Sequence, residues 1–293
     1  MTIPAKFCLD MSDTFYRNAG VSRVNRNGFE LVRLEDFDII FVKTDFIYSG
    51  EFQRRFLNSI NKKFILVSGV SSYSVDEGNP TYRNILNNPF LIKWFCTNPP
   101  LILHPKMEGL PIGFEEKERD GGNIEVLNYF YNNSTPWESK KDKIYIPYHS
   151  NTFSTRNQII NELSKKDFVE VEQNRLGFKD YLSKMDKYKF ILSLRGAGWD
   201  CHRHYESLLV GSVPIMDGGP ILGFFKNNSL PVLDTGEINS KIFTKSFNFL
   251  YTKDFLTMEY HFSKINSLLS TPIRWCPSCD TLHPAKTLEE APF

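Results

Sequence analysis

Residues 188–216 read YKFILSLRGAGWDCHRHYESLLVGSVPIM, and this stretch indicates the fold more clearly than any other part of the chain. An apolar strand at 190–194 leads into a turn with two glycines, and a helix follows at about 200–210. A second apolar strand at 213–216 completes the stretch. This order of elements predicts one βαβ unit with an opening of phosphate size at its first turn.

The turn between the first strand and the helix is suited to an anion. Gly196 and Gly198 allow positive φ and close approach of the backbone, and Asp200 is placed to cap the helix, whose free N–H groups face the same space. Arg195 before the helix and Arg203 in its first turn add positive charge where acidic residues are usually preferred. We therefore expect a bound anion to supply the missing negative charge.

A carboxylate lies one helical turn after this cationic cluster. Glu206 is three residues after Arg203, so both side chains project from one helical face, and a carboxylate beside a phosphate site suits ribose hydroxyls. Trp199 is placed either to stack on a base or to pack against the turn. The alternative to a nucleotide site is a surface ion pair between Arg203 and Glu206, with Asp200 as an ordinary helix cap.

The same residues resemble a known family signature. The stretch RGAGWDCHRHYESLLVGSVPI is similar to the donor-site signature of exostosin-like glycosyltransferases, in which R-G-x-G-x-D is followed by R-x-x-E-x-L and G-x-x-P-[IV]. The matching positions are Arg195, Gly196, Gly198, Asp200, Arg203, Glu206, Leu208, Gly211, Pro214 and Ile215. Weaker resemblance to the short soluble members of this family, including those of large algal viruses, covers most of residues 39–235.

This resemblance implies an α/β fold with GT-B architecture, that is, two Rossmann-like domains facing an interdomain cleft. It implies that the C-terminal domain holds a nucleotide-sugar donor and that no catalytic metal or other cofactor is required. Animal members of the family carry additional domains, so their acceptors are not carried over to this chain.

The composition indicates a folded protein without a large charged surface. The 293 residues are 41% hydrophobic and 14% aromatic, with a formal net charge of +1. This length suits two domains, and the small charge argues against a nucleic-acid partner. Five scattered cysteines argue against a disulfide framework, and no apolar run approaches the ~18 residues that a membrane span needs. We expect a soluble cytoplasmic protein, in the host cytoplasm if the source is a virus.

Strand and helix signals alternate in two sets. Apolar runs such as FDIIFVKTDF and KKFILVSGV alternate with helical stretches, which is typical of a parallel sheet covered on both faces. The charged stretch 115–143 separates this set from a second one that begins at KIYIPY. We place an acceptor-side domain at 1–125 and a nucleotide-sugar-binding domain at 143–252. We expect the C-terminal region 253–293, with a helix at about 253–269, to join the first domain.

A glycosyltransferase has to stabilise a departing nucleoside diphosphate. Arg195 and Arg203 can offset that charge, each charge-assisted contact contributing about 1.5–3 kcal/mol, and we assign Arg195 a catalytic role. Arg156, near the start of the helix after KIYIPY, can bind a phosphate through two N–H groups; the alternative is a solvated surface arginine. His202 and His204 cannot share a helical face as metal ligands, but one of them can line the same pocket.

Inversion at the sugar also requires a base that takes the proton of the acceptor hydroxyl. Asp45, Asp76 and Glu77 follow apolar strands of the first domain, where side chains reach a cleft. We favour Asp76, since its Ser-, Tyr- and Gly-rich loop keeps a carboxylate partly solvated. A helix cap or a surface position is the alternative for each of the three.

Two other motifs have the spacing of metal sites. Asp36 and Asp38 form the D-x-D pattern of metal-dependent GT-A transferases, but they precede the apolar strand IIFV instead of following it, which favours a role in solvating the strand edge. Cys276 and Cys279, with His283 nearby, have half of a zinc-knuckle spacing and no second pair. We interpret them as residues of a packed tail or as cysteines that pair by oxidation, in preference to a zinc site.

The expected function is transfer of one sugar from a UDP-sugar to a glycan or glycoprotein hydroxyl, without a metal and with inversion. UDP-xylose is the first donor to test, followed by UDP-glucuronic acid, UDP-galactose and UDP-N-acetylglucosamine. Two other classes stay open: a non-catalytic module that binds nucleotide sugars or glycans, and a GT-A enzyme that uses Asp36 and Asp38.

Overall fold

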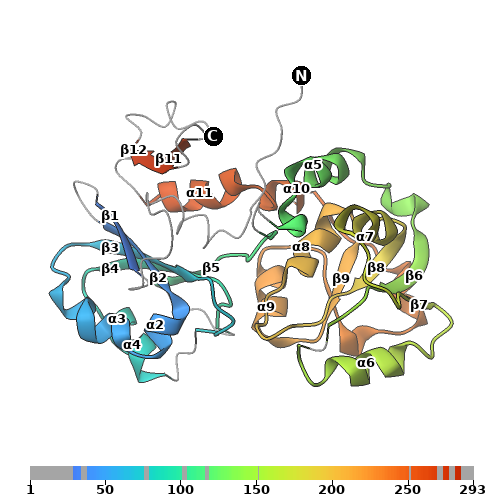
Figure 1. Cartoon of the computed structure of the whole chain (residues 1–293), viewed down its shortest axis with the longest axis horizontal. Coiled ribbons are helices and arrows are strands. Elements are labelled where there is room, and N and C mark those ends of the chain that lie inside the picture. Colours follow the sequence, from blue (N-terminus) through green and yellow to red (C-terminus); the bar gives the residue numbers. More distant parts are fainter. Residues whose placement is uncertain are drawn as a thin grey trace. The chain divides into compact units, whose positions relative to one another are not determined.

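The computed structural model describes residues 29–33, 38–75, 79–100, 104–115, 119–150, 152–250, 252–268, 273–276 and 281–284 (Figure 1). The chain divides into two compact units. Within the described residues, Gly113–Thr257 forms the C-terminal unit, and the chain up to Ile112 together with the residues from Met258 onward forms the N-terminal unit. Both are α/β units built on a five-stranded, mostly parallel sheet.

The N-terminal unit has a sheet whose strands follow one another in chain order. The strands are β1 (Phe29–Arg33), β2 (Asp38–Lys43), β3 (Phe64–Gly69), β4 (Leu91–Cys96) and β5 (Met107–Gly109). The first pairs antiparallel with its neighbour and the other pairs are parallel. Every residue of β3 is buried, as expected for a continuous apolar run in a sheet that is covered on both faces.

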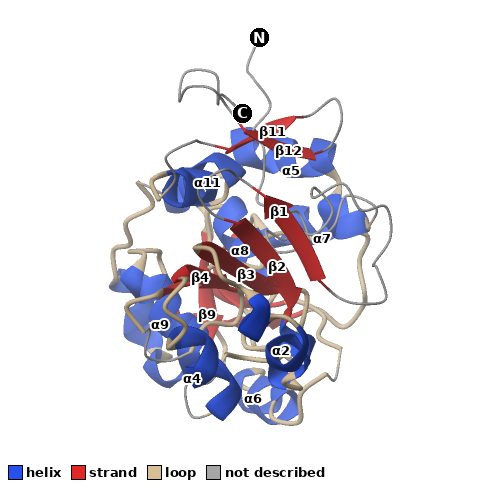
Figure 2. Ribbon diagram, turned by 90° about the vertical axis from the view of Figure 1, so that its left-hand side faces the viewer, coloured by secondary structure: helices blue, strands red, loops and turns tan. Residues whose placement is uncertain are grey.

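Helices cover both faces of this sheet. They are α2 (Thr44–Tyr48), α3 (Glu51–Arg55), the 3₁₀ turn η1 (Leu57–Ser59), α4 (Pro80–Leu86) and α11 (Met258–Asn266). Figures 1 and 2 show α2 and α4 on one side of the sheet and α11 on the other. The first side has a core that includes Phe52, Leu66 and Trp94. On the other side, Lys264 of α11 pairs with Glu108 of β5 at 3.1 Å.

The C-terminal unit has a different strand order, which contains a reversal. Its strands are β6 (Lys141–Ile146), β7 (Val169–Val171), β8 (Tyr188–Leu192), β9 (Val213–Met216) and β10 (Leu233–Asp234). All pairs are parallel, in the order β10-β9-β8-β6-β7. The connections from β6 and β8 therefore leave in opposite directions. In such sheets the crevice at the carboxyl ends of these two strands is the usual ligand site.

The predicted βαβ unit is confirmed. It consists of β8, α8 (His202–Leu209) and β9, and β8 pairs in parallel with β9. Gly211, with a φ of 67°, follows α8 in the left-handed conformation that commonly ends a helix.

The other helices of this unit are α5 (Ile124–Asn133), α6 (Arg156–Leu163), α7 (Phe178–Met185), α9 (Gly219–Asn227) and α10 (Thr252–Phe255). The remaining short elements of the chain are η2 (Asp120–Gly122), η3 (Trp137–Ser139), η4 (Thr235–Glu237), η5 (Ser240–Thr244), and the hairpin β11 (Ile273–Cys276) with β12 (Thr281–Pro284).

The single helix expected at about 253–269 is two helices in the structure. The division between the units falls between them, so α10 belongs to the C-terminal unit and α11 to the N-terminal unit. Across the described residues, every helix is too short or too polar to cross a membrane.

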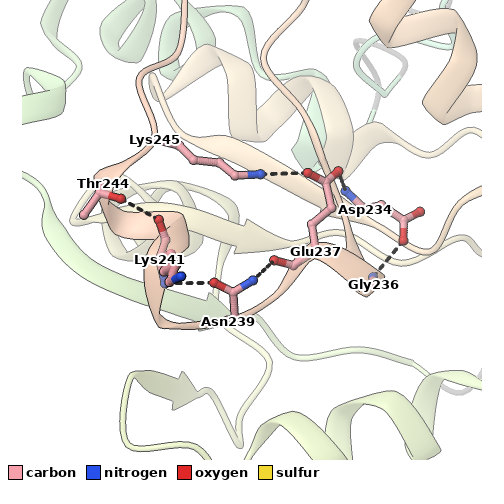
Figure 3. A network of polar contacts seen from close by, with 7 residues as sticks. All are labelled: Asp234, Gly236, Glu237, Asn239, Lys241, Thr244 and Lys245. Atoms are coloured by element: carbon pink, nitrogen blue, oxygen red, sulfur yellow. Dashed lines mark hydrogen bonds and ion pairs between the residues drawn. The ribbon is translucent and has the colours of Figure 1, made fainter.

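A network of polar contacts fastens the chain after β10 (Figure 3). The Asp234 carboxylate accepts from the Gly236 N–H at 2.7 Å, and Glu237 accepts from the Asp234 N–H at 3.1 Å. The second Glu237 oxygen accepts from Lys245 Nζ at 2.7 Å, and Asn239 donates to the Glu237 carbonyl. This reciprocal capping arrangement fixes the loop at the carboxyl end of the last strand.

Candidate functional site

A cavity of about 420 Å³ lies in the C-terminal unit, where the strand order reverses. Its walls come from the loops after β6 and β7, from α7, from the start of α8, and from the residues around η2. This volume is within the usual range of small-molecule sites. The cavity therefore occupies the position that the topology favours for a ligand.

Helix α8 brings Arg203 and Glu206 into the wall of this cavity, and a tyrosine links them. The Tyr181 hydroxyl donates to Glu206 Oε2 at 2.7 Å, and Arg203 Nε donates to the same hydroxyl oxygen at 3.2 Å. Arg203 Nη2 also donates to the Tyr148 carbonyl at 3.2 Å. No direct ion pair joins Arg203 and Glu206 in the described structure, so the surface ion pair considered above is wrong. Arg203 Nη1 makes no hydrogen bond to described residues, which leaves donors for a ligand.

Glu206 is a buried carboxyl group. Its burial raises its pKa, while the hydrogen bond from Tyr181 and the charge of Arg203 act in the opposite direction. A carboxyl group held in this way has a fixed orientation and can accept hydrogen bonds from hydroxyl groups of a ligand.

Arg156 is buried, with 5% of its surface exposed, so the solvated surface position is wrong. Its Nε and Nη2 donate to the carbonyls of Arg195 and Leu194 at 2.6 and 2.9 Å. Its Nη1 donates to the Ser150 carbonyl and to Thr152 Oγ1. Most of its N–H groups therefore tie the loop after β6 to the loop after β8. Its charge still lines the cavity, and no carboxylate of the described chain forms an ion pair with it.

Arg195 does not line the cavity, in contrast to the position expected for a phosphate-binding catalytic residue. Its guanidinium carbon lies 3.7 Å from the ring centre of Trp199 and 4.2 Å from that of Phe153, and Nη2 donates to the Ala197 carbonyl at 3.1 Å. The backbone N–H of Arg195 donates to Asp217 at 2.8 Å. The side chain thus makes cation–π contacts with two aromatic rings.

Trp199 packs against the turn that starts α9. A Cβ atom added at Gly219, whose φ is 76°, would lie 2.2 Å from the Trp199 ring. Of the two positions considered for Trp199, the structure therefore shows the packed one. Neither Gly196 nor Gly198 has a positive φ. A Cβ at Gly196 would lie 3.5 Å from both Arg156 Nη2 and Thr152 Oγ1, which is ordinary contact, so neither neighbour requires a glycine at this position.

Asp200 does not cap α8. Its Oδ2 accepts from the Tyr205 hydroxyl at 2.7 Å, and the N-cap residue is Cys201, which makes no side-chain cap hydrogen bond. The first turn of α8 contains no acidic residue. Among the described residues, no side chain caps the amino end of α8, which carries Arg203 in its first turn, and this arrangement favours an anion.

Of the two histidines, His202 lines the cavity and His204 does not. His202 Nδ1 is hydrogen-bonded to the Gly113 carbonyl at 2.8 Å, so Nδ1 carries the proton and Nε2 is left for a ligand. His204 is fully buried against Ser193, and this burial lowers its pKa.

The cavity also contains residues that the sequence analysis missed. Arg175 follows β7, and Tyr148 and Phe178 add aromatic rings, whereas Glu115 and Asp120 add acidic groups on another wall. Tyr148 and Arg175 share a position shortly after the carboxyl ends of β6 and β7. That signal could have been used only with the strand order, which the sequence does not show.

Comparisons with known proteins give no match: no family model fits the chain, and no curated protein sequence is similar to it.

The other predicted residues either lie outside the described residues or are not among those that line this cavity. Asp76 and Glu77 lie outside the described residues, as do Asp36 and Cys279. Asp38 is the first residue of β2, and Cys276 is the last residue of β11. Asp45, in the first turn of α2, lies 3.9 Å from Lys43 Nζ. In the part of the chain that the structure describes, no three His, Cys, Asp or Glu side chains are grouped as metal ligands.

Proposed function

We propose that this protein is a glycosyltransferase of GT-B architecture that binds the nucleoside diphosphate of a sugar donor in the C-terminal cavity. The observation that supports this most is the grouping, in one cavity, of Arg203, the uncapped start of α8 and the buried Glu206. A diphosphate requires the first two, and a ribose with free hydroxyls suits the third. The resemblance of residues 195–215 to the exostosin-like signature supports the same donor class, and UDP-xylose remains the first donor to test.

In this proposal Arg203 and the α8 amides stabilise the charge that develops on the departing diphosphate. Each charge-assisted hydrogen bond contributes about 1.5–3 kcal/mol, and it acts without reorganisation because the groups are already in place. Arg156 contributes its charge and holds the two loops at a fixed distance. Arg195 acts indirectly: its carbonyl orients Arg156, and its side chain keeps Trp199 in position.

The acceptor in this proposal is a hydroxyl group of a glycan, and its proton is taken by a carboxylate of the N-terminal unit. We keep Asp76 as the first candidate and Asp45 as the second. Replacement of Asp76 by Asn is expected to abolish transfer and to leave UDP binding intact. Normal transfer by this variant would reject the assignment.

The test of the donor site is UDP binding measured by thermal shift and calorimetry. UDP at ~100 times its dissociation constant stabilises a folded protein by about 2.7 kcal/mol. Arg203→Ala and Glu206→Gln are expected to reduce this stabilisation, whereas Arg55→Ala, an exposed arginine of α3, is the matched control. An equal response of Arg203→Ala and the original protein would overturn the proposal. Binding without transfer or hydrolysis would indicate a non-catalytic module, and loss of transfer in a chelator would indicate GT-A chemistry.

A further inference from the structure

Two tyrosines in the N-terminal unit form an exposed stacked pair. Tyr48 ends α2 and Tyr73 lies in the loop after β3, and their ring centres are 4.3 Å apart with an interplanar angle of 10°. The two residues keep 50% and 44% of their surface exposed. Because α2 and this loop follow neighbouring parallel strands, the pair lies at the carboxyl edge of the sheet, where ligand sites of α/β sheets are found.

The polar ends of both rings are also available. Neither the Tyr48 nor the Tyr73 hydroxyl makes a hydrogen bond to the described residues, whereas the buried Tyr82 donates to the Ser74 carbonyl at 3.3 Å. Tyrosine combines a flat apolar face with a polar tip, which is the reason for its enrichment in binding surfaces. The pair therefore presents both kinds of contact to a partner.

The loop that carries Tyr73 is held in a fixed conformation. Val70 has a φ of 50° and Asn98, in the loop after β4, has a φ of 49°. The Asn98 side chain donates to the Ser71 carbonyl, and the Asn98 carbonyl accepts from the Val75 N–H, both at 3.2 Å. A β-branched residue with positive φ is strained, and such strain is concentrated at functional sites. A surface that is fixed before binding costs less entropy when it binds.

Charged groups of both signs lie at the start of the helix that carries Tyr48. Asp45 precedes Tyr48 by three residues, so the two side chains are neighbours on α2. The Asp45 side chain is 41% exposed, so one face of its carboxylate is open to solvent, and its Oδ2 lies 3.9 Å from Lys43 Nζ, whose side chain is 38% exposed. A ligand rich in hydroxyl groups can donate to this carboxylate and accept from the ammonium group.

We propose that Tyr48 and Tyr73 form a platform that binds the pyranose ring of a saccharide, with Asp45 and Lys43 contacting its hydroxyls. A pyranose with equatorial hydroxyls has a face of C–H groups, which are attracted to the negative face of an aromatic ring, and a rim of hydroxyls. Because the two rings are stacked on each other, the saccharide contacts the outer face of the pair, and the carboxylate and ammonium groups at the start of α2 suit its hydroxyls. The role of this saccharide as acceptor rests on the proposed function; its binding does not.

The experiment uses saturation-transfer NMR with methyl β-D-xylopyranoside, methyl β-D-galactopyranoside and xylotriose, without nucleotide. We expect transfer to the protons of one ring face in at least one of these probes. Tyr48→Ala and Tyr73→Ala are expected to weaken that binding about five- to tenfold. Tyr73→Phe keeps the ring and retains binding. Tyr129→Ala removes a tyrosine of similar exposure on α5, and it is expected to have no effect.

Two further variants and one parallel measurement complete the test. Asp45→Asn and Lys43→Met are each expected to weaken binding while they leave the stacked pair in place. Binding that is equal in the original protein and in a Tyr48→Ala, Tyr73→Ala double variant overturns the proposal. So does the absence of binding by all three probes at millimolar concentration when circular dichroism shows an intact fold. UDP binding, measured on the same samples, reports separately on the donor cavity, so failure of one proposal is distinguishable from failure of the other.

Discussion

At the scale of single residues, Arg156 is notable in the cavity wall because its side chain donates four hydrogen bonds. It joins the loop after β6 to the carbonyls of Leu194 and Arg195, and it is almost fully buried. The sequence predicted that this arginine binds a phosphate. It did not indicate that the arginine donates to backbone carbonyls, because these carbonyls lie about forty residues further along the chain. Side-chain contacts of this kind depend on the strand order, which local patterns do not encode.

Replacement of Arg156 is therefore expected to destabilise the protein as well as weaken donor binding. Arg156→Ala leaves buried carbonyls without donors, and we expect the free energy of unfolding to fall by about 3 kcal/mol or more. Arg156→Lys keeps the charge but loses the forked geometry, so it should recover only part of this loss. Urea denaturation measures both. The control Arg55→Ala breaks an exposed i,i+4 ion pair and should cost at most about 0.5 kcal/mol. A similarly small loss of unfolding free energy in Arg156→Ala would show that the hydrogen bonds of this buried arginine do not stabilise the protein.

His149 gives a prediction for the pH dependence of stability. Its burial, with a further contribution from the Arg203 charge, lowers its pKa to about 2, and its buried Nε2 makes no hydrogen bond to the described residues. Between that value and the ordinary pKa of about 6.5 the unfolded chain binds the additional proton, so stability rises with pH over this range and is lost as the pH falls below about 6.5. The loss approaches about 1.4 kcal/mol per pH unit. In His149→Gln the slope of the unfolding free energy against pH should decrease by about 1.4 kcal/mol per pH unit, which corresponds to one proton. An unchanged slope would show that His149 does not cause the pH dependence.

At the scale of elements, α8 was predicted nearly to its ends, because glycine and an apolar strand follow it. Its cap was predicted wrongly. Asp200 had the right residue type one position too early, and Cys201, which does not cap, occupies the N-cap position. Tyr205 takes the Asp200 carboxylate instead. The Asp200 carboxylate therefore makes a hydrogen bond with a tyrosine side chain instead of capping the helix, and no local sequence pattern indicates this bond.

A cap introduced at this position is expected to compete with the donor. Cys201→Asp places a carboxylate at the N-cap position of α8, where no side chain caps the helix among the described residues, so its negative charge should compete with a bound anion. The substitution should therefore weaken UDP binding about tenfold or more, since a loss of ~1.4 kcal/mol corresponds to a factor of ten. Cys201→Ser tests the cap without the charge and should have a smaller effect on affinity. Calorimetry measures the affinities, and unchanged UDP affinity in Cys201→Asp would show that the anion lies elsewhere.

The start of α9 provides a packing test with a matched control in the same helix. Gly219 has a φ of 76°, and an added Cβ would lie 2.2 Å from the Trp199 ring, so Gly219→Ala should cost about 3 kcal/mol or more. Gly223 lies in the same helix, and a Cβ added there would have no neighbouring atom within 4 Å, so Gly223→Ala should stabilise by up to about 1 kcal/mol. Combining Gly219→Ala with Trp199→Ala should recover the part of the loss that comes from the clash. Thermal denaturation of the four proteins checks these signs, and equal effects at the two glycines would contradict the contact.

At the scale of the whole molecule, the two units share a composition of parallel strands and helices but differ in strand order. The sequence predicted the alternation of strands and helices in both, because continuous apolar runs mark strands covered on two faces. It did not predict that only the C-terminal sheet, among the described strands, reverses its order between β6 and β8. The order of strands depends on long-range pairing, and the cavity follows from that order more than from the glycines of the turn.

The division into two units leads to a prediction about where ligands protect the backbone. UDP should slow amide hydrogen exchange most strongly in the loops after β6 and β7 and at the start of α8, at about residues 147–156, 172–178 and 201–206, because these segments form the cavity wall and gain contacts on binding. A saccharide on the tyrosine platform should instead slow exchange at about residues 44–48 and 70–75. Exchange mass spectrometry with each ligand alone measures both patterns, and Arg203→Ala and Tyr73→Ala serve as crossed controls, since each should remove one pattern and retain the other. Protection by UDP confined to residues 38–75 would contradict the placement of the donor in the C-terminal unit.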